Sequence, residues 1–242
     1  MNPLVSVVIP TIPERKRLLE RAVKSVKNQT YDNIEIVTVT EGNNACEARN
    51  IGIERSNGEF ISFLDDDDTW QPTKIEKQVD ELLKHTWSPL CVTYSRDLRF
   101  DQDRISKTSH VITHNEAIES FSVSSTSTYL VRKQALEEIK EKDGYYFDES
   151  LVSAQEYDLA LRLSKYEDII TVEDVLVTQY QSENQISENW KKKKKGLKQV
   201  YKKHKKDFSN HYITYIAIQS LFTLADIGLG NKIYKIINKV RK

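Results

Sequence analysis

The first 85 residues alternate short apolar runs with segments whose apolar side chains recur at helical spacing. The runs are rich in β-branched or aromatic residues and predict strands at 5–9, 34–40 and 60–64. The periodic segments predict helices with one apolar face at 15–28, 45–55 and 73–85. Strand and helix in strict alternation predict parallel strands joined by right-handed crossover helices. Helices on both faces of such a sheet explain why its strands are apolar almost throughout.

After residue 90 the pattern becomes less regular. Two strands, two helices and two closing strands are expected, in that order, at 91–95, 127–131, 133–142, 156–164, 169–172 and 175–180. A Lys-rich helix is expected at 190–206, where the composition changes. We therefore predict an α/β fold in residues 1–189, with a Rossmann-like mixed, mainly parallel sheet flanked by helices, and a C-terminal helical extension in residues 190–242.

Charge is distributed unevenly along a chain whose 36 basic and 36 acidic residues give a net charge of zero. Residues 1–189 carry 21 Lys and Arg against 34 Asp and Glu, whereas residues 190–242 carry 15 against 2. An acidic body with a basic tail argues against a uniform nucleic-acid-binding face, so we expect no nucleic-acid partner. The composition, 38% hydrophobic and 30% charged, is that of a globular protein rather than a disordered or membrane-spanning one.

Two features of the sequence bear on the compartment. Cys46 and Cys91 stand alone, without the spacing of a metal site, and are expected to be small core residues in a reducing environment. The N-terminus has no basic segment before its apolar run, which ends at Pro10, and is interpreted as a first strand rather than a signal peptide. We therefore expect a cytoplasmic protein.

Four aspartates at 65–68 directly follow the third predicted strand. Ligands of open α/β sheets bind at the carboxyl ends of the strands. Adjacent carboxylates repel one another, by about 1 kcal/mol per pair at about 4 Å in bulk water, and a hard divalent cation relieves that repulsion. In extended backbone Asp65 and Asp67 face one way and Asp66 and Asp68 the other, so one face can hold Mg²⁺ or Mn²⁺. The alternative is a solvated acidic turn.

Four stretches follow one another over roughly residues 4–180: VSVVIPT (5–11), SVKNQTYDNIEIV (25–37), ARNIGIERSNGEFISFLDDDDTW (48–70), and FDESL with QEYDLALRL (147–163). Together they resemble the inverting family 2 glycosyltransferases of the GT-A fold. The resemblance implies transfer of a sugar from a nucleotide-sugar donor, expected to be UDP-linked, to a hydroxyl of a glycan or lipid-linked acceptor. The QxxRW signature of processive synthases is absent, which favours transfer of a single sugar.

The resemblance also implies contacts to the nucleotide. The loop after the first strand lies against the base in that family, which makes Pro10 and Thr11 candidates here. Arg49 matches an arginine that packs near the base. The second strand of the family normally ends in an aspartate that contacts the uracil or ribose, and this chain carries Glu41 there, whose longer side chain would substitute.

At the acidic run, the resemblance assigns ribose and metal contacts to Asp65 and the principal metal contact to Asp67, with Asp66 next to the donor. The ion expected is Mn²⁺ or Mg²⁺. Asp66 and Asp68 would otherwise only shape the turn.

Inverting transfer requires a general base that deprotonates the acceptor hydroxyl as it attacks the anomeric carbon. The family places this base in a Glu-Asp pair at the start of a helix, after an FDE-type segment. Alignment puts Glu156 at the base position, where the usual aspartate has become glutamate. Asp158 is the alternative base and a candidate substrate contact, although two residues along a helix it would point elsewhere.

Two weaker signals lie outside this site. His110 and His114 have the i, i+4 spacing of a metal pair, but no third ligand is evident near them in the sequence, and no ion is assigned. The apolar stretch at 212–229 is interrupted by polar residues and is not expected to span a bilayer. It could lie with residues 190–242 on an anionic membrane surface, at the cytoplasmic face, or pack on the domain or a second subunit of a homo-oligomer.

Two other functions compete with an active glycosyltransferase. The departures at Glu41 and Glu156 allow a catalytically silent relative that binds a nucleotide-sugar or a partner protein. A sugar nucleotidylyltransferase would need a Gly-rich phosphate loop after the first strand, and the sequence PTIP at 10–13 offers none.

Overall fold

The computed structural model describes residues 2–99, 103–120, 125–181 and 190–209. Contacts divide the chain into two units, one made of Met1–Glu149 and Gln155–Glu183, the other of Ser150–Ala154 and Asn184–Lys242. The division lies close to the composition change predicted at residue 190. A separate role for the C-terminal extension stays a prediction.

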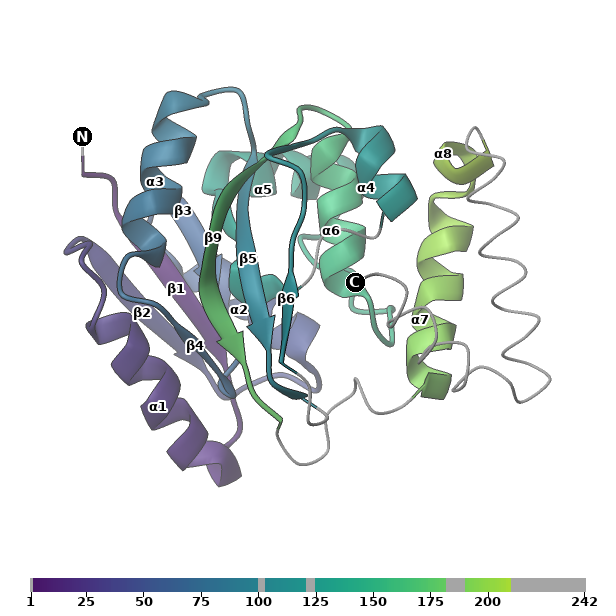
Figure 1. The fold of residues 1–242 in the computed structure, drawn as a ribbon. Coiled ribbons are helices and arrows are strands. Elements are labelled where there is room, and N and C mark those ends of the chain that lie inside the picture. Colours follow the sequence, from purple (N-terminus) through teal and green to yellow (C-terminus); the bar gives the residue numbers. More distant parts are fainter. Residues whose placement is uncertain (1, 100–102, 121–124, 182–189, 210–242) are drawn as a thin grey trace. The chain divides into compact units, whose positions relative to one another are not determined.

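In the described part of the chain, nine strands form one sheet (Figure 1). Seven follow one another in the order β2-β1-β3-β8-β5-β9-β4, while β6 pairs with β5 and β7 with β9. The bounds are β1 Val5–Pro10, β2 Ile34–Val39, β3 Phe60–Phe63, β4 Asp68–Trp70, β5 Leu90–Asp97, β6 Arg104–Ser106, β7 Val111–Ile112, β8 Leu130–Arg132 and β9 Ile169–Gln179.

The directions of the strands place the carboxyl ends of most of them at one edge of the sheet. β1 pairs in parallel with β2 and β3, and β5 in parallel with β9. Because β8 is antiparallel to both β3 and β5, all five of these strands run the same way. They are also the longest strands, so the sheet is mixed but mainly parallel, as predicted. The four aspartates leave the carboxyl end of β3, at the edge where β1 and β2 also end.

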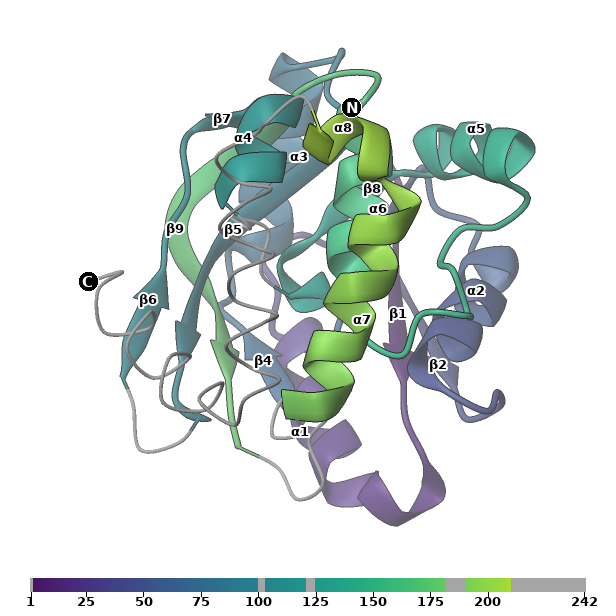
Figure 2. The same cartoon turned by 90° about the vertical axis from the view of Figure 1, so that its right-hand side faces the viewer.

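Helices cover both faces of the sheet (Figures 1 and 2). In the first unit they are α1 Lys16–Lys27, α2 Ala45–Arg55, α3 Lys74–Lys84, α4 His114–Ser120, α5 Lys133–Asp143 and α6 Gln155–Ser164, with 3-10 turns at Pro13–Arg15 and Thr126–Thr128. The right-handed connections expected between parallel strands put α1 and α2 on opposite faces, because β2 and β3 flank β1 on its two sides.

Alternation along β1 decides which helices meet which face. Val5, Val7 and Ile9 belong to the core cluster that contains the buried side chains of α1 and α3. Val8 faces α2 instead, where a Cβ added to Gly52 would lie 2.3 Å from its Cγ1 atom. Only glycine therefore lets α2 approach the sheet this closely, and α2 carries Arg49 toward the carboxyl edge.

The observed elements differ from the predicted ones, and β6, β7 and α4 are short elements that were not predicted. The two predicted closing strands are the single strand β9, because the exposed Glu173 and Asp174 interrupt its apolar pattern. β4 was not predicted, since a three-residue strand directly after the aspartates is too short for a periodic signal. The strand predicted at 127–131 begins only at Leu130, after the 3-10 turn Thr126–Thr128.

The second unit contains the Lys-rich helix α7 (Trp190–Lys203) and the short helix α8 (Lys205–Ser209). Within this unit the Oγ atom of Ser153 donates to the carbonyl oxygen of Lys192 at 3.1 Å. Gly196 allows the approach, because a Cβ there would lie 2.1 Å from Ser153 Oγ. Within the described ranges no helix has the length and apolar character needed to cross a membrane. The apolar stretch at 212–229 lies outside the described residues.

Candidate donor site

The four aspartates form a tight loop between β3 and β4, which we call the acidic loop (residues 65–68). The backbone N–H of Asp68 donates to the carbonyl oxygen of Asp65 at 2.9 Å and closes the turn. The chain then enters β4, where Asp68 pairs with Gln179 of β9. The loop is therefore fixed at both ends by the sheet, unlike a solvated surface turn.

Burial alternates along the acidic loop. The side chains of Asp65 and Asp67 are 31% and 14% exposed, whereas Asp66 and Asp68 are buried. Thr11 Oγ1 donates to Asp66 at 2.6 Å, and Ser127 Oγ donates to Asp68 at 2.7 Å. Two carboxylates thus hold the loop from inside, while Asp65 and Asp67 keep a solvent-facing side.

The electrostatics of the loop follow this alternation. Burial raises the pKa of Asp66, against the lowering effect of the Thr11 hydrogen bond and the Arg15 charge. Burial also raises the pKa of Asp68 well above its ordinary value, and repulsion from Asp65 and Asp67 acts in the same direction. The loop is therefore a place where added positive charge is stabilising.

Two arginines that the sequence reasoning did not single out lie on this loop. Arg15 places one nitrogen 2.8 Å from Asp66 and another 2.8 Å from Asp67. Arg21 donates to the backbone carbonyl of Asp67 at 2.5 Å, and its guanidinium lies 4.2 Å from the ring centre of Tyr180. The basic residues around the first turn of α1 were the available signal, but their helical spacing also fits an ordinary surface.

Arg49 reaches the acidic loop from α2. Its side chain is buried, its Nη2 atom lies 2.5 Å from Asp65 Oδ1, and its guanidinium lies 5.7 Å from the ring centre of Phe147. Burial opposes the charged form, yet the pKa of Arg49 is raised, chiefly by the charge of Asp65 and also by that of Glu156. The structure therefore brings the predicted residues Arg49 and Asp65 together.

Glu156 occupies the second position of α6, as the sequence predicted for a helix start. Its side chain is half-buried, and its backbone carbonyl accepts a hydrogen bond from the hydroxyl of Tyr129 at 3.0 Å. Its negative charge acts on both Arg49 and Tyr129 and raises the pKa of each. Its role as a base stays a prediction.

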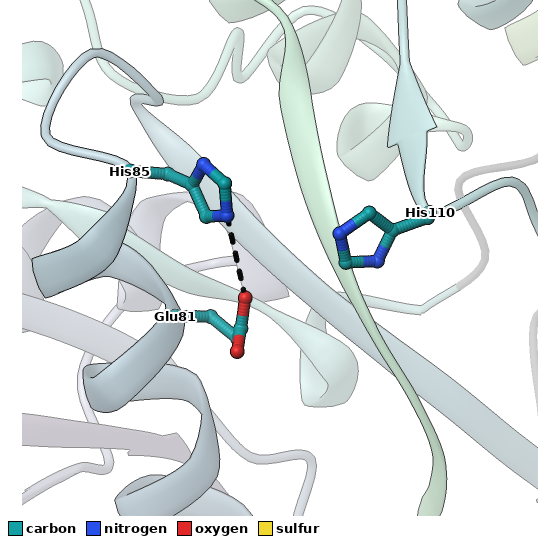
Figure 3. Close-up of side chains that lie close together, drawn as sticks. All are labelled: Glu81, His85 and His110. Atoms are coloured by element: carbon teal, nitrogen blue, oxygen red, sulfur yellow. Dashed lines mark ion pairs between the residues drawn. The ribbon is translucent and has the colours of Figure 1, made fainter.

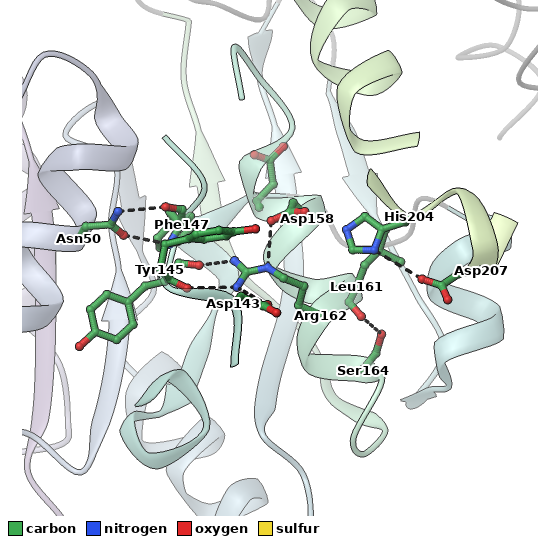
Figure 4. A network of polar contacts seen from close by, with 12 residues as sticks. Asn50, Asp143, Tyr145, Phe147, Asp158, Leu161, Arg162, Ser164, His204 and Asp207 are labelled. Carbon is green, nitrogen blue, oxygen red and sulfur yellow. Dashed lines mark hydrogen bonds and ion pairs between the residues drawn. The ribbon is translucent and has the colours of Figure 1, made fainter. Parts of the chain in front are cut away.

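Asp158 has a different environment from Glu156. It is fully buried, and its Oδ2 atom accepts from Arg162 Nε at 3.0 Å (Figure 4). Arg162 also donates to the carbonyl oxygens of Tyr145 and Tyr146, and so ties α6 to the chain before the FDE segment. This arrangement assigns Asp158 to positioning α6, and the substrate contact predicted for it finds no support in the geometry.

The FDE segment (residues 147–149) is in turn held by α2. Asn50 donates from its side-chain amide to the carbonyl oxygen of Phe147 at 3.0 Å and accepts from the Phe147 N–H at 2.9 Å (Figure 4). The same amide donates to Glu149 at 2.8 Å. Asn50 and Arg49 are neighbours on α2, so one helix turn positions both the acidic loop and the approach to α6.

The predicted nucleotide contacts lie at the ends of β1 and β2. Pro10 ends β1. The backbone N–H of Thr11 donates to the carbonyl oxygen of Val39, the last residue of β2, at 2.9 Å. Glu41 is exposed on the loop after β2 and pairs with Arg55 at 2.9 Å. That pairing lowers the pKa of Glu41 to about 2, so its side chain carries a full negative charge at neutral pH. Their contacts to a nucleotide stay predictions.

Comparison with known proteins points to the same class of protein as the motifs of the sequence. Residues 37–140 match the protein family described as Glycosyl transferase family 2. Over 93% of its length the chain is 26% identical to the putative colanic acid biosynthesis glycosyl transferase WcaA of Escherichia coli (strain K12), of which it covers 88%. These matches make the chain similar to glycosyltransferase family 2. The resemblance inferred from its motifs is therefore confirmed. The chain spans 18% to 44% of the length of three other curated relatives, all uncharacterized glycosyltransferases.

Two solved structures share the fold of this chain. The mannosyltransferase PcManGT from Pyrobaculum calidifontis, in complex with GDP-Man and Mn²⁺, matches with a TM-score of 0.65 at 16% identity, over 85% of this chain and 65% of that one. S. aureus TarS 1-349, in complex with UDP-GlcNAc, matches with a TM-score of 0.59 at 17% identity, over 75% of this chain and 60% of that one. At such identities the likeness shows the fold, and the predicted GT-A architecture is confirmed.

Proposed function

We propose that this chain is a metal-dependent, inverting glycosyltransferase. It moves one sugar from a UDP-linked nucleotide-sugar to a hydroxyl of a glycan or lipid-linked acceptor. One observation carries the proposal: Arg49 is buried against Asp65 of the acidic loop and also feels the charge of Glu156. The donor contacts and the candidate base are therefore linked through one arginine at the carboxyl edge of the sheet.

The acidic loop suits a divalent cation by the chemistry of its ligands. Asp65 and Asp67 offer carboxylate oxygens from the solvent-facing side of the loop, and Mg²⁺ and Mn²⁺ prefer such oxygen ligands. Asp66 and Asp68 are occupied by hydroxyl donors and keep the turn in shape. A cation bound there supplies positive charge to the donor diphosphate.

The protein's own residues perform the remaining steps. The Glu156 carboxylate takes the proton of the acceptor hydroxyl, whose oxygen forms the new bond to the anomeric carbon. The bond between that carbon and the diphosphate oxygen breaks, and its electron pair leaves with the nucleoside diphosphate. Arg15 sits at Asp66 and Asp67 with 31% of its side chain exposed, so we assign it to balancing the charge on the leaving group.

The nucleotide of the donor and the class of the acceptor are proposed from different observations. Solved structures that share the fold hold UDP-GlcNAc in one case and GDP-Man in another. We favour UDP because Glu41 takes the position where the second strand of the family normally ends in an aspartate that contacts the uracil or ribose. For the acceptor, the run of five lysines at 191–195 in α7 suits a location at an anionic membrane surface, on its cytoplasmic face, where lipid-linked acceptors are presented.

A donor screen tests this function. The full-length protein is heated with Mn²⁺ and each of a panel of nucleotide-sugars. A true donor at about 100 times its Kd should stabilise the fold by about 2.7 kcal/mol, and Mn²⁺ should be required. Release of the nucleoside diphosphate then separates an active enzyme from a silent relative, which would bind without turnover. Stabilisation by no nucleotide-sugar, with or without Mn²⁺, would contradict the proposal.

A further inference from the structure

A second group of metal-ligating side chains lies outside the donor site. Glu81 belongs to the last turn of α3, His85 ends that helix, and His110 comes just before β7 (Figure 3). One ligand atom from each of the three lies within 4.8 Å of the other two. His85 Nε2 lies 3.5 Å from Glu81 Oε2. Segments 25 positions apart in the sequence thus direct two imidazoles and a carboxylate to one point.

The spacing of these atoms suits a transition metal. Four ligand atoms about 2.1 Å from a tetrahedral zinc ion lie about 3.4 Å from one another. The Glu81–His85 separation already has this value, and the exposed His110 needs only a small side-chain movement to complete the triad. The i, i+4 spacing on α3 fixes the first two ligands on one helix face. His110 is held by its backbone, because its carbonyl oxygen accepts from the Thr171 N–H at 2.7 Å.

The companion that the sequence spacing suggested for His110 is not part of this group. The Nδ1 atom of His114 lies 2.8 Å from Ser164 Oγ, on α6. The i, i+4 pair of histidines is therefore not a metal pair. The true neighbours of His110 could not be found from sequence, since they come from the far end of α3.

The position of the group separates it from sugar transfer. His85 precedes the start of β5, and Thr171, which holds His110, lies near the start of β9. β5 and β9 run in the same direction as β3, whose carboxyl end carries the acidic loop. The group therefore lies at the amino-terminal edge of the sheet, opposite the donor site.

We propose that Glu81, His85 and His110 form a zinc site with water in the fourth position. Two imidazoles and one carboxylate match the ligand preference of Zn²⁺. Mg²⁺ and Ca²⁺ prefer sites built from oxygen alone, so this site and the acidic loop select different ions. Bound zinc joins the end of α3 to the segment before β7 and stabilises the edge where β7 pairs with β9. Lys84, which lies 2.9 Å from Glu81 Oε1, competes with the ion for that carboxylate.

Zinc titration of the full-length, metal-stripped protein tests the site. The titration is done in an Asp67→Asn background, in which the acidic loop has lost one carboxylate. One Zn²⁺ per chain is expected to bind. His110→Gln should weaken this binding at least about 10-fold, a loss that changing a partner of a metal ligand already causes. His110 is exposed, so this substitution leaves the fold intact. His114→Gln is the matched control and should bind as tightly as the parent.

Co²⁺ gives an independent readout of the same ligands. The ring of Trp87 packs edge-on against His85 with centroids 5.4 Å apart, so bound Co²⁺ should quench its fluorescence. Quenching should disappear in Trp87→Phe and diminish in His110→Gln and Glu81→Gln. Lys84→Met should tighten the binding by removing the competing charge. Equal Zn²⁺ affinity in the parent, His110→Gln and Glu81→Gln would overturn the proposal, as would the absence of a tight Zn²⁺ equivalent in the parent.

Discussion

The Nη2 atom of Arg49 lies 2.5 Å from Oδ1 of Asp65, and this pair joins α2 to the acidic loop. Arg49 is buried while Asp65 keeps 31% of its side chain exposed, so the arginine is held from within and the aspartate remains open to a ligand. Gly52, three residues further along α2, lets the helix lie close enough to β1 for this contact. The pair is the structural connection between the packing of the core and the donor site.

Removing the guanidinium of Arg49 is expected to impair donor binding. Arg49→Lys keeps a positive charge but cannot reach Asp65 in the same geometry while packing against Phe147. A hydrogen bond to a charged group contributes about 1.5–3 kcal/mol, so the donor KM should rise about 10-fold or more. The measurement is initial rates against donor concentration. Lys140→Gln, which removes an exposed ion pair with Glu54, is the control and should leave KM unchanged.

Replacing the proposed metal ligand tests the metal requirement. Asp67→Asn removes one carboxylate charge from the solvent-facing side of the acidic loop and should lower activity about 100-fold or more at a fixed Mn²⁺ concentration. Raising Mn²⁺ should restore part of it, because the remaining ligands still bind weakly. Asp174→Asn, at an exposed ion pair with Lys77, is the matched control. Full activity of Asp67→Asn without added metal would exclude the assigned role.

The residue before α6 is strained. Ala154 has φ = 63°, in the left-handed region that side chains rarely adopt, at a cost of roughly 1–2 kcal/mol. Ala154→Gly relieves this strain but makes the unfolded chain more flexible. We expect a net gain in unfolding free energy of up to about 1 kcal/mol, measured by urea denaturation. Ala160→Gly in the interior of α6 should instead destabilise the protein by about 1 kcal/mol.

A buried lysine makes the stability depend on pH. Lys74 is fully buried, with its Nζ atom 3.1 Å from Ser62 Oγ and 3.9 Å from the ring centre of Trp70. Burial lowers its pKa well below the ordinary value of 10.5. Between the lowered pKa and 10.5 the unfolded chain binds one more proton, so the unfolding free energy should increase as the pH rises through that range.

Lys74→Met should abolish this slope and stabilise the protein at neutral pH, because a polar group whose burial is costly gives way to an apolar side chain of similar size. Urea unfolding at several pH values measures both effects. Lys77→Met, at an exposed position of the same helix, should keep the slope and change the stability little. A parallel slope in Lys74→Met would mean that another group causes the pH dependence.

Apart from the three-residue strand β4, the order of strands and longer helices up to residue 85 could be predicted, because each of these elements is long enough to show its own period. The acidic loop could also be located, since it follows a buried strand. Arg15 and Arg21 could not be assigned, because their contacts to Asp66 and Asp67 depend on how α1 packs. The neighbours of His110 could not be predicted from the sequence for the same reason.

Residues near α6 show the same limit. Glu156 and Asp158 look equivalent in sequence, as two acidic residues at a helix start. The structure separates them, because Asp158 is buried against Arg162 while Glu156 stays half-buried and acts on Arg49. A pattern gives the position of a carboxylate, and only the packed neighbours decide whether it supports the fold or faces a ligand.

The central claim is that Glu156 is the base for sugar transfer, and the kinetics of Glu156→Gln test it most directly. General-base catalysis contributes about 10²- to 10⁴-fold, so kcat should fall by at least about 100-fold, while the donor Kd measured by thermal shift with Mn²⁺ stays nearly unchanged. Glu149→Gln, which loses only a hydrogen bond from Asn50, should keep most of the activity. Undiminished turnover by Glu156→Gln would contradict the account.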